Sequence, residues 1–205
     1  MRAGNIYLLP ILGTIIFVIL FFTATLYYPG GNQVYSQASG FSWRNNYWCN
    51  LLMDIAINDE HNAAKPAALA GAVILALTLV MFWFLFFSYV AFSKSAKVVL
   101  QLSAVLSMSL SLFIFTQWHD VLITIAGIFG VIALSGTFIG LYKLRWNNLL
   151  VLGIVNLLLV FINNIIYYKT DRYWLPVIQK ITFALFLFWI CLICLKMFKK
   201  AEPAF

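Results

Sequence analysis

The sequence predicts an all-α membrane protein, a bundle of six transmembrane helices with a short amphipathic extracytoplasmic helix in its first long loop. Hydrophobic residues make up 64% of the 205 residues and charged residues only 9%, whereas a soluble domain carries roughly a quarter charged residues. Nearly uncharged stretches of about 18 residues or more recur, and each can cross about 30 Å of hydrocarbon as a helix. No segment alternates in polarity over the roughly ten residues of a barrel strand, so helices are expected.

The apolar stretches predict one domain over residues 1–205 with six spans. We expect these at about 8–28, 67–92, 98–116, 121–142, 149–167 and 177–197, with a long extracytoplasmic loop at 29–66. The first stretch ends in Tyr28-Pro29-Gly30-Gly31 and has no small-residue cleavage site, so it predicts a retained helix and not a signal peptide. No charge sits in the middle of a span, which argues against a proton pump or an ion-coupled carrier.

The basic residues divide between the two ends of the predicted spans. One end has eight: Arg2, Lys94, Lys97, Lys143, Arg145, Lys196, Lys199 and Lys200. The other has five: Arg44, Lys65, Lys169, Arg172 and Lys180. The larger group lies in short loops and tails, which predicts that both termini lie in the cytoplasm. Small groups at helix ends are a topological signal, so the net charge of +7 does not predict binding of nucleic acid.

The long loop shows a helical pattern over residues 46–58. Asn46, Asn50, Asp54 and Asn58 recur every four residues and would form one polar stripe. The opposite face would consist of Trp48, Leu51, Leu52 and Ile55. This pattern predicts a short helix that lies on the outer membrane surface or folds over the bundle, with its apolar face buried.

Two histidines and several carboxylates fall at the predicted outer side. His119 and Asp120 lie between the third and fourth spans, and His61 follows Asp59 and Glu60 at the end of the loop. Imidazole with carboxylate can bind zinc or orient a general base, so His119, Asp120 and His61 are the candidate catalytic residues and also the candidate metal ligands. Their spacing matches no metal signature. The alternative is a set of polar residues that end helices, with Asp120 at a helix N-terminus.

Three amides, one guanidinium and one carboxylate give the candidate ligand-binding residues, which are Arg44, Asn46, Asp54, Asn163 and Asn164. The two asparagines of the fifth span should point into the bundle, because a buried amide without a partner costs a few kcal/mol. They bond either to another helix or to a ligand. Gly136 and Gly140 have the G-x-x-x-G spacing of close helix packing, either inside the chain or between copies in a homo-oligomer.

The first loop also resembles a known family. The matching segments are Tyr28-Pro29-Gly30-Gly31, then Gly40-Phe41-Ser42-Trp43-Arg44-Asn45-Asn46-Tyr47, Asn50-Leu51 and Glu60-His61-Asn62. They resemble bacterial six-span proteins catalogued as domain of unknown function number nine hundred and ninety-eight, which are distantly similar to DRAM-type membrane proteins. Cys49-Asn50-Leu51-Leu52 stands where that family has Ser-Asp-Leu-Gly, and His119 matches a family histidine after the third span. The resemblance implies the fold, the topology and a location in the bacterial cytoplasmic (inner) membrane, and no activity.

Together these features predict a non-enzymatic membrane protein that binds a lipid or a small apolar molecule, with its polar site on the extracytoplasmic side. The alternative is a membrane-embedded, metal-dependent lipid hydrolase or transferase that uses His119, Asp120 and His61. A third reading is a subunit of a larger complex. If the outer polar residues form a functional site, His119, Asp120, His61 and either Asp54 or Asn163 should converge on one cavity.

Overall fold

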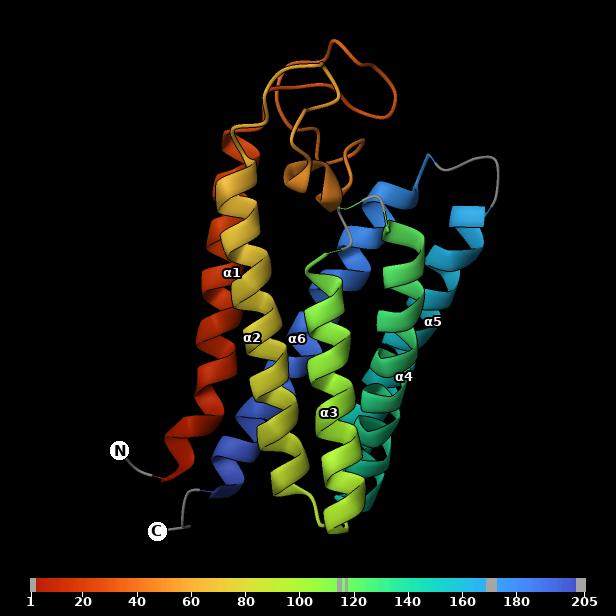
Figure 1. Cartoon of the computed structure of the whole chain (residues 1–205). Helices are drawn as coiled ribbons and strands as arrows, with labels where there is room; N and C mark the ends of the chain where they lie inside the picture. The colour runs from red at the N-terminus through yellow and green to blue at the C-terminus, as the bar shows by residue number, and fades with distance from the viewer. Residues whose placement is uncertain (1–2, 114–115, 117, 169–172, 202–205) are drawn as a thin grey trace. The chain divides into compact units, whose positions relative to one another are not determined.

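The chain folds as six long α-helices in the computed structural model, which describes residues 3–113, 116, 118–168 and 173–201. The helices are α1 (Leu9–Leu26), α2 (Lys65–Tyr89), α3 (Lys94–Ser111), α4 (His119–Lys143), α5 (Asn147–Tyr168) and α6 (Leu175–Ala201) (Figure 1). Two 3-10 helices, η1 (Ala3–Leu8) and η2 (Trp48–Leu52), complete the regular structure of the described residues. The predicted all-α class is therefore confirmed.

Five helical segments in the described residues are long and apolar enough to cross a membrane. They are Gly4–Leu26, Lys65–Tyr89, Val121–Lys143, Asn147–Tyr168 and Leu175–Ala201. This supports the prediction of a membrane protein. α3 is not among the five: it has 18 residues, and its sequence includes Lys94, Lys97 and Gln101 besides several serines. Among the described residues, six long helices are present as predicted. Five of the six are clearly apolar enough to cross a membrane.

The serines of α3 are bonded within the chain. Ser107 Oγ donates to the Ala126 carbonyl of α4 at 2.9 Å, and Ser111 Oγ donates to the Ser107 carbonyl at 2.8 Å. Ser103 is buried as well. A serine that bonds a helix carbonyl is satisfied without water, and the bond of Ser107 connects α3 to α4.

Two compact units make up the chain. Unit 1 comprises Met1–Ile15, Val73–Gly153 and Phe188–Phe205, and unit 2 comprises Ile16–Ala72 and Ile154–Leu187. The aromatic core of unit 1 includes Phe82, Phe86 and Phe87 of α2, all fully buried. Two buried indoles of unit 1 are satisfied: Trp83 Nε1 donates to Thr137 Oγ1 at 3.1 Å, and Trp189 Nε1 donates to the Leu149 carbonyl at 2.7 Å.

The glycine pair of α4 packs inside unit 1. A Cβ on Gly136 would lie 2.5 Å from Leu100 of α3, and one on Gly140 would lie 2.7 Å from Phe86 of α2. Both distances are too short for non-bonded carbon atoms, so each glycine permits a close helix contact. The glycine pair thus packs within the chain, and the homo-oligomer stays a prediction.

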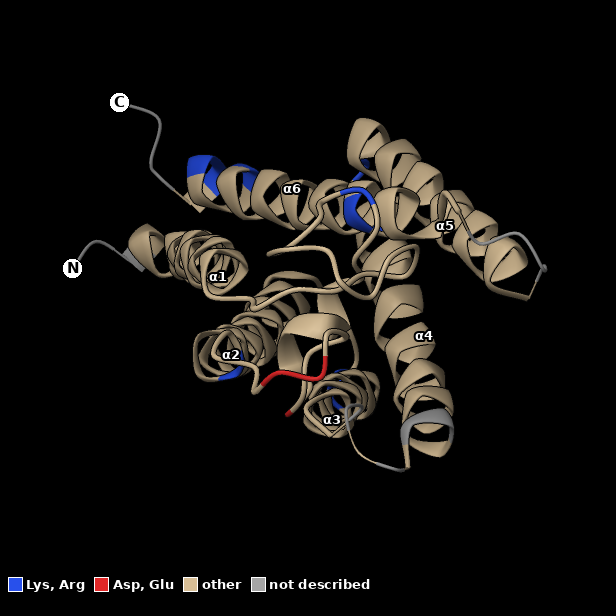
Figure 2. Ribbon diagram, turned by 90° about the horizontal axis from the view of Figure 1, so that it is seen from above, with Lys and Arg blue, Asp and Glu red and all other residues tan. Residues whose placement is uncertain are grey.

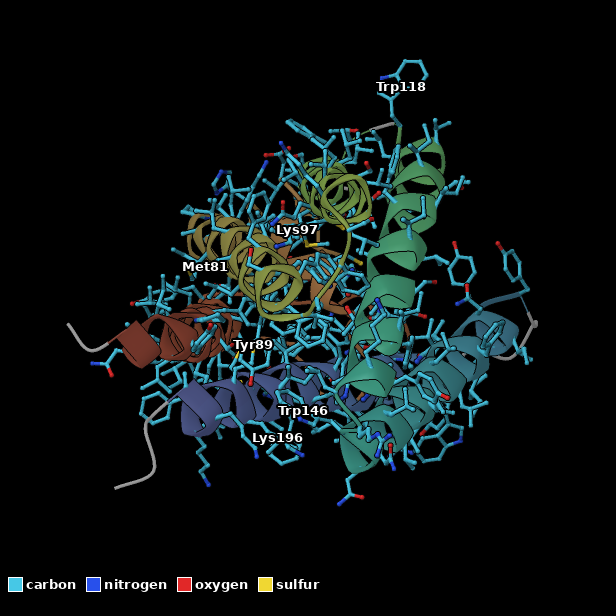
Figure 3. All side chains as sticks on the ribbon, turned by 90° about the horizontal axis from the view of Figure 1, so that it is seen from below. Met81, Tyr89, Lys97, Trp118, Trp146 and Lys196 are labelled. Carbon is cyan, nitrogen blue, oxygen red and sulfur yellow. The ribbon has the colours of Figure 1, made fainter. Side chains whose placement is uncertain are left out.

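An aromatic chain at one end of unit 1 leads to a lysine. Tyr7 and Tyr89 have ring centroids 5.8 Å apart, and Tyr89 is 5.8 Å from Trp146. Lys196 Nζ lies 5.0 Å from the Trp146 centroid, and Figure 3 shows Tyr89, Trp146 and Lys196 grouped there. Lys143 also contacts an aromatic ring: its ammonium lies 4.7 Å from the Phe92 centroid and donates a hydrogen bond to the Ala91 carbonyl. Lysines of this unit therefore use rings and carbonyls as partners.

The predicted helix over residues 46–58 is wrong in its extent. Only the five residues of η2 are helical, and the chain is extended at Met53. Leu51 and Leu52 are buried as expected, but Ile55 is exposed. The reason is that Asn46 and Asn50 are buried and bond to nearby backbone groups, which competes with helix formation. The loop that connects α1 to α2, residues 27–64, is consequently an irregular, hydrogen-bonded structure (Figure 1).

Candidate functional site

Three buried asparagine side chains hold the α1–α2 loop together. Asn46 Nδ2 donates to the Gly31 carbonyl at 2.8 Å, and its Oδ1 accepts from the Ser42 N–H at 2.8 Å. Asn62 Nδ2 donates to the carbonyls of Asn50, Leu51 and Met53, at 3.0, 3.3 and 2.8 Å. Asn50 Oδ1 accepts from the Tyr47 N–H at 2.7 Å. An irregular buried backbone needs such partners, and these amides supply them.

Gly31 allows two loop segments to cross. Its φ is +78°, and a Cβ there would lie 2.5 Å from the backbone nitrogen of Asn58. Only glycine combines that conformation with that approach. Nearby, the Tyr28 hydroxyl accepts a hydrogen bond from the Ile57 N–H at 3.2 Å. The Pro-Gly-Gly element thus fixes the loop against its own second half.

Aromatic rings of α1 and the loop form one continuous cluster in unit 2. We call this the aromatic cluster; its members are Phe21, Phe22, Tyr28, Phe41, Trp43 and Trp48. Adjacent centroids are 5.3 to 6.3 Å apart, the range of stacked and edge-to-face pairs. Trp43 is exposed, while Phe41 and Trp48 are half-buried. The cluster therefore has an accessible side.

Lys180, one turn into α6, reaches this cluster. Its ammonium donates to the Asn46 carbonyl in the loop and to the Pro176 carbonyl at 3.0 Å. It lies 5.7 Å from the Phe41 centroid and 5.8 Å from the Trp48 centroid. Those distances fall within the roughly 6 Å limit of a cation–π contact. A lysine near the end of an apolar helix is thus held by two carbonyls and two rings.

Arg44 joins the loop to the beginning of α6 in a similar way. Its guanidinium carbon lies 4.9 Å from the Tyr173 ring and 5.3 Å from the Trp174 ring. Arg44 is exposed, as are both rings. A stacked guanidinium keeps its in-plane N–H groups available for hydrogen bonds.

One indole of the cluster is unsatisfied. Trp48 Nε1 is buried and has no hydrogen-bond partner among the described residues. An indole N–H can only donate, and a buried donor without an acceptor costs about 1–3 kcal/mol. Such a group calls for a specific reason.

The loop carboxylates lie elsewhere in unit 2. Asp54 forms an ion pair with Lys65 at the start of α2, and Asp59 and Glu60 are exposed. In Figure 2 the acidic stretch of the loop, in red, is on the side of α2 and separate from the blue segments at the start of α6. Within the described residues, no carboxylate forms an ion pair with Lys180 or Arg44. The positive charges of Lys180 and Arg44 therefore have no carboxylate partner among the described residues.

Cys49 lies beside this group. Desolvation by the surrounding protein raises the pKa of its thiol, while backbone hydrogen bonds and the charge of Lys180 act in the opposite direction. The side chain nevertheless retains exposed surface. A thiol of this kind is mainly protonated at neutral pH.

The asparagines of α5 have different environments. Asn163 Nδ2 donates to Thr182 Oγ1 of α6 at 2.6 Å and to the Leu159 carbonyl at 3.0 Å. Its Oδ1 is buried without a partner among the described residues. Asn164 is exposed and bonds the Val160 carbonyl of its own helix at 2.9 Å. Asn163 thus makes the bond to another helix that was one of the two alternatives left by the sequence. The expectation that Asn164 points into the bundle is wrong, because its side chain is exposed.

The remaining site residues are not brought together by the described structure. His61 is exposed and pairs with Ile55 in an isolated bridge. His119 and Asp120 form the first turn of α4, but their side chains lie outside the described part of the structure, as do Lys169, Asp171 and Arg172. Among the side chains that are described, no three His, Cys, Asp or Glu residues could hold a metal ion. The predicted convergence on one cavity stays a prediction.

Sequence reasoning selected Arg44 and Asn46 but not Lys180 or Trp48. The available signal was a lysine near the start of an apolar helix, because such a lysine requires specific partners. Comparisons of the chain with family models, with curated proteins and with solved structures each gave no match. The candidate site therefore rests on its own geometry.

Proposed function

We propose that this protein binds an amphiphilic molecule of the membrane, a lipid or a small apolar compound with a polar head, at the loop end of unit 2. The loop lies on the extracytoplasmic side in this proposal. The observation that carries it is the position of Lys180: its ammonium, at the start of an apolar helix, contacts the aromatic cluster. A charged group next to an apolar helix surface suits a ligand with the same division of polarity.

The surroundings of Lys180 support this proposal. Trp43 and Trp174 are exposed aromatic residues at the same end of unit 2, as is common where a protein meets the headgroup region of a membrane. Apolar side chains of α5, among them Leu158, Phe161 and Ile165, are exposed and would contact the ligand chain or the surrounding lipid.

Native mass spectrometry of the protein released from a mild detergent tests the proposal. We expect one amphiphile to stay bound per chain, and the Lys180→Gln variant to lose it. Lys65→Gln is the matched control, since it removes a lysine from an exposed ion pair of the same unit. Absence of any retained amphiphile from the wild-type protein, before and after addition of lipid extract, would refute the proposal.

A further inference from the structure

The chemical class of the headgroup follows from the partners of Lys180. Resting on the proposed amphiphile site, we propose that the headgroup is an anionic oxygen group, a phosphate or a carboxylate, bound by Lys180 with Trp48 Nε1 and Arg44 as further donors.

No acidic group among the described residues pairs with Lys180. Both of its hydrogen-bond acceptors, the carbonyls of Asn46 and Pro176, are neutral. The loop carboxylate with an ion pair, Asp54, is engaged by Lys65. A partly buried cation beside aromatic rings is poorly hydrated, and an anion at this point restores the lost stabilisation.

Two N–H groups remain available to bind such an anion, one on Lys180 and one on Trp48. An ammonium has three N–H groups, and two of those of Lys180 are used by the two carbonyls. The buried N–H of Trp48 has no acceptor among the described residues. Charge-assisted hydrogen bonds to phosphate or carboxylate oxygens are the strong ones, so the third ammonium N–H and the indole N–H suit this acceptor class.

The aromatic rings do not form a site for a positively charged headgroup. Aromatic cages in proteins bind quaternary ammonium groups such as choline. Here the rings of Phe41 and Trp48 already face the ammonium of Lys180. A cationic head at the same rings would be repelled by that ammonium, so a head with only negative charge is preferred over a choline-bearing one.

Arg44 provides a second positive group in the same part of unit 2. It lies in the loop two positions from Asn46, whose carbonyl binds Lys180, and it stacks on Trp174 of the segment that leads into α6. A planar guanidinium can bind two oxygens of one phosphate or carboxylate. The two cations therefore flank the junction between the loop and α6.

Titration of the purified protein in a maltoside detergent with two probes of equal chain length tests the headgroup. The probes are dodecyl phosphate and dodecylphosphocholine, followed by native mass spectrometry. We expect dodecyl phosphate to bind about tenfold or more tightly, a preference of the size that one charge-assisted hydrogen bond provides. Lys180→Gln should reduce the preference to about twofold, and Lys180→Arg should retain most of it.

Matched variants separate the indole N–H from the ring. Trp48→Phe removes the buried N–H and should weaken dodecyl phosphate binding several-fold. Trp43→Phe makes the same chemical change at an exposed ring of the cluster and should have little effect. Equal losses in the two variants would remove Trp48 Nε1 from the headgroup site.

The outcomes distinguish the headgroup inference from the proposed function. Equal binding of both probes to the wild-type protein would overturn the anionic headgroup and leave amphiphile binding intact. Binding of neither probe would overturn both. Inorganic phosphate is the third probe: if it displaces dodecyl phosphate at equal concentration, the site binds a free anion, and the amphiphile proposal is wrong. We expect no displacement.

Discussion

The ammonium of Lys180 in α6 donates a hydrogen bond to the backbone carbonyl of Asn46, 134 residues earlier in the chain. This bond connects a membrane helix directly to the loop, and it does so without an acidic residue. The loop therefore depends on a single cation for one of its attachments to α6. The first prediction concerns this attachment.

Lys180→Met should loosen the loop around Asn46. It removes the ammonium and keeps most of the apolar stem, so the Asn46 carbonyl loses a charged donor. We expect hydrogen exchange of peptides covering residues 41–50 to become roughly tenfold faster, in line with a charged hydrogen bond of about 1.5–3 kcal/mol. Lys65→Met should leave these peptides unchanged, because an exposed ion pair contributes little. Unchanged exchange in Lys180→Met would show that the bond does not hold the loop.

Asn62→Ala should destabilise the loop more than any single exposed substitution. The Asn62 amide donates to three carbonyls and accepts from the Ala64 N–H at 3.1 Å. Loss of these bonds leaves buried backbone groups without partners, at a cost of about 2–4 kcal/mol if two of them stay unsatisfied. Asn58→Ala, which removes one exposed bond to the Glu60 N–H, is the control. Thermal unfolding in detergent measures both, and equal melting temperatures would contradict the prediction.

Gly31→Ala and Gly40→Ala separate backbone strain from steric overlap. Both glycines have positive φ, +78° and +65°, but only Gly31 faces another segment, since a Cβ on Gly40 meets nothing within 4 Å. Gly40→Ala should cost about 1–2 kcal/mol for the left-handed conformation alone. Gly31→Ala should cost clearly more, because the backbone of Asn58 would have to move. Equal losses in thermal stability would show that the crossing is adjustable.

The number of spans can be tested at α3. A helix of 18 residues is about 27 Å long at 1.5 Å per residue, close to the thickness of the hydrocarbon core. Ser107 and Ser111 form hydrogen bonds within unit 1, so these two hydroxyls need no water at a transmembrane position. We expect reporter fusions at Lys94, Lys143 and Lys199 to be cytoplasmic, and fusions at Asn58 and Thr116 to be extracytoplasmic.

The alternative topology gives a different pattern. If α3 does not cross, Thr116 will be on the same side as Lys94, and Lys143 and Lys199 will both be on the other side. A cytoplasmic signal at Thr116 would therefore overturn the six-span prediction. The charge distribution argues against that result, since it would separate the basic residues of the α2–α3 connection from those near Lys143.

The helices were predictable from the sequence because length and hydropathy decide them. The predicted fourth span, 121–142, lies within α4, His119–Lys143, and the predicted fifth, 149–167, lies within α5. The loop was not predictable by the same reasoning. The four-residue repeat that begins at Asn46 reads as a helix stripe, yet the Asn46 amide bonds the Gly31 carbonyl, fifteen residues away in the chain. A long-range bond of this kind overrides local periodicity.

The candidate site was likewise predictable from the sequence only in part. Arg44 was selected because a cation in the loop is visible in the sequence. The role of Lys180 was missed, because its partners are backbone carbonyls and rings that no spacing rule connects to it. The unsatisfied Trp48 N–H is likewise a property of the folded loop and not of the residue type.

Cys49 should report the charge of Lys180. Burial raises the pKa of the Cys49 thiol, and the positive charge of Lys180 partly opposes this shift. Only the thiolate reacts with maleimides, so at neutral pH a polar maleimide should modify Cys49 more slowly than a free cysteine. Lys180→Gln removes the opposing charge, which raises the pKa of Cys49 further and should slow the reaction at pH 7–8. The chain for this measurement carries Cys191→Ala and Cys194→Ala.

The pH profile separates charge from access. A raised pKa moves the rise of the reaction rate to higher pH, and the rate reaches its plateau only when the thiol is fully ionised. Wild type and Lys180→Gln should therefore differ at pH 7–8 and converge at high pH. Lys180→Arg, which keeps the positive charge, should follow the wild-type profile. A reaction rate that differs from that of wild type by a constant factor at every pH would indicate changed access to Cys49. Identical profiles would show that the charge of Lys180 does not change the pKa of the thiol.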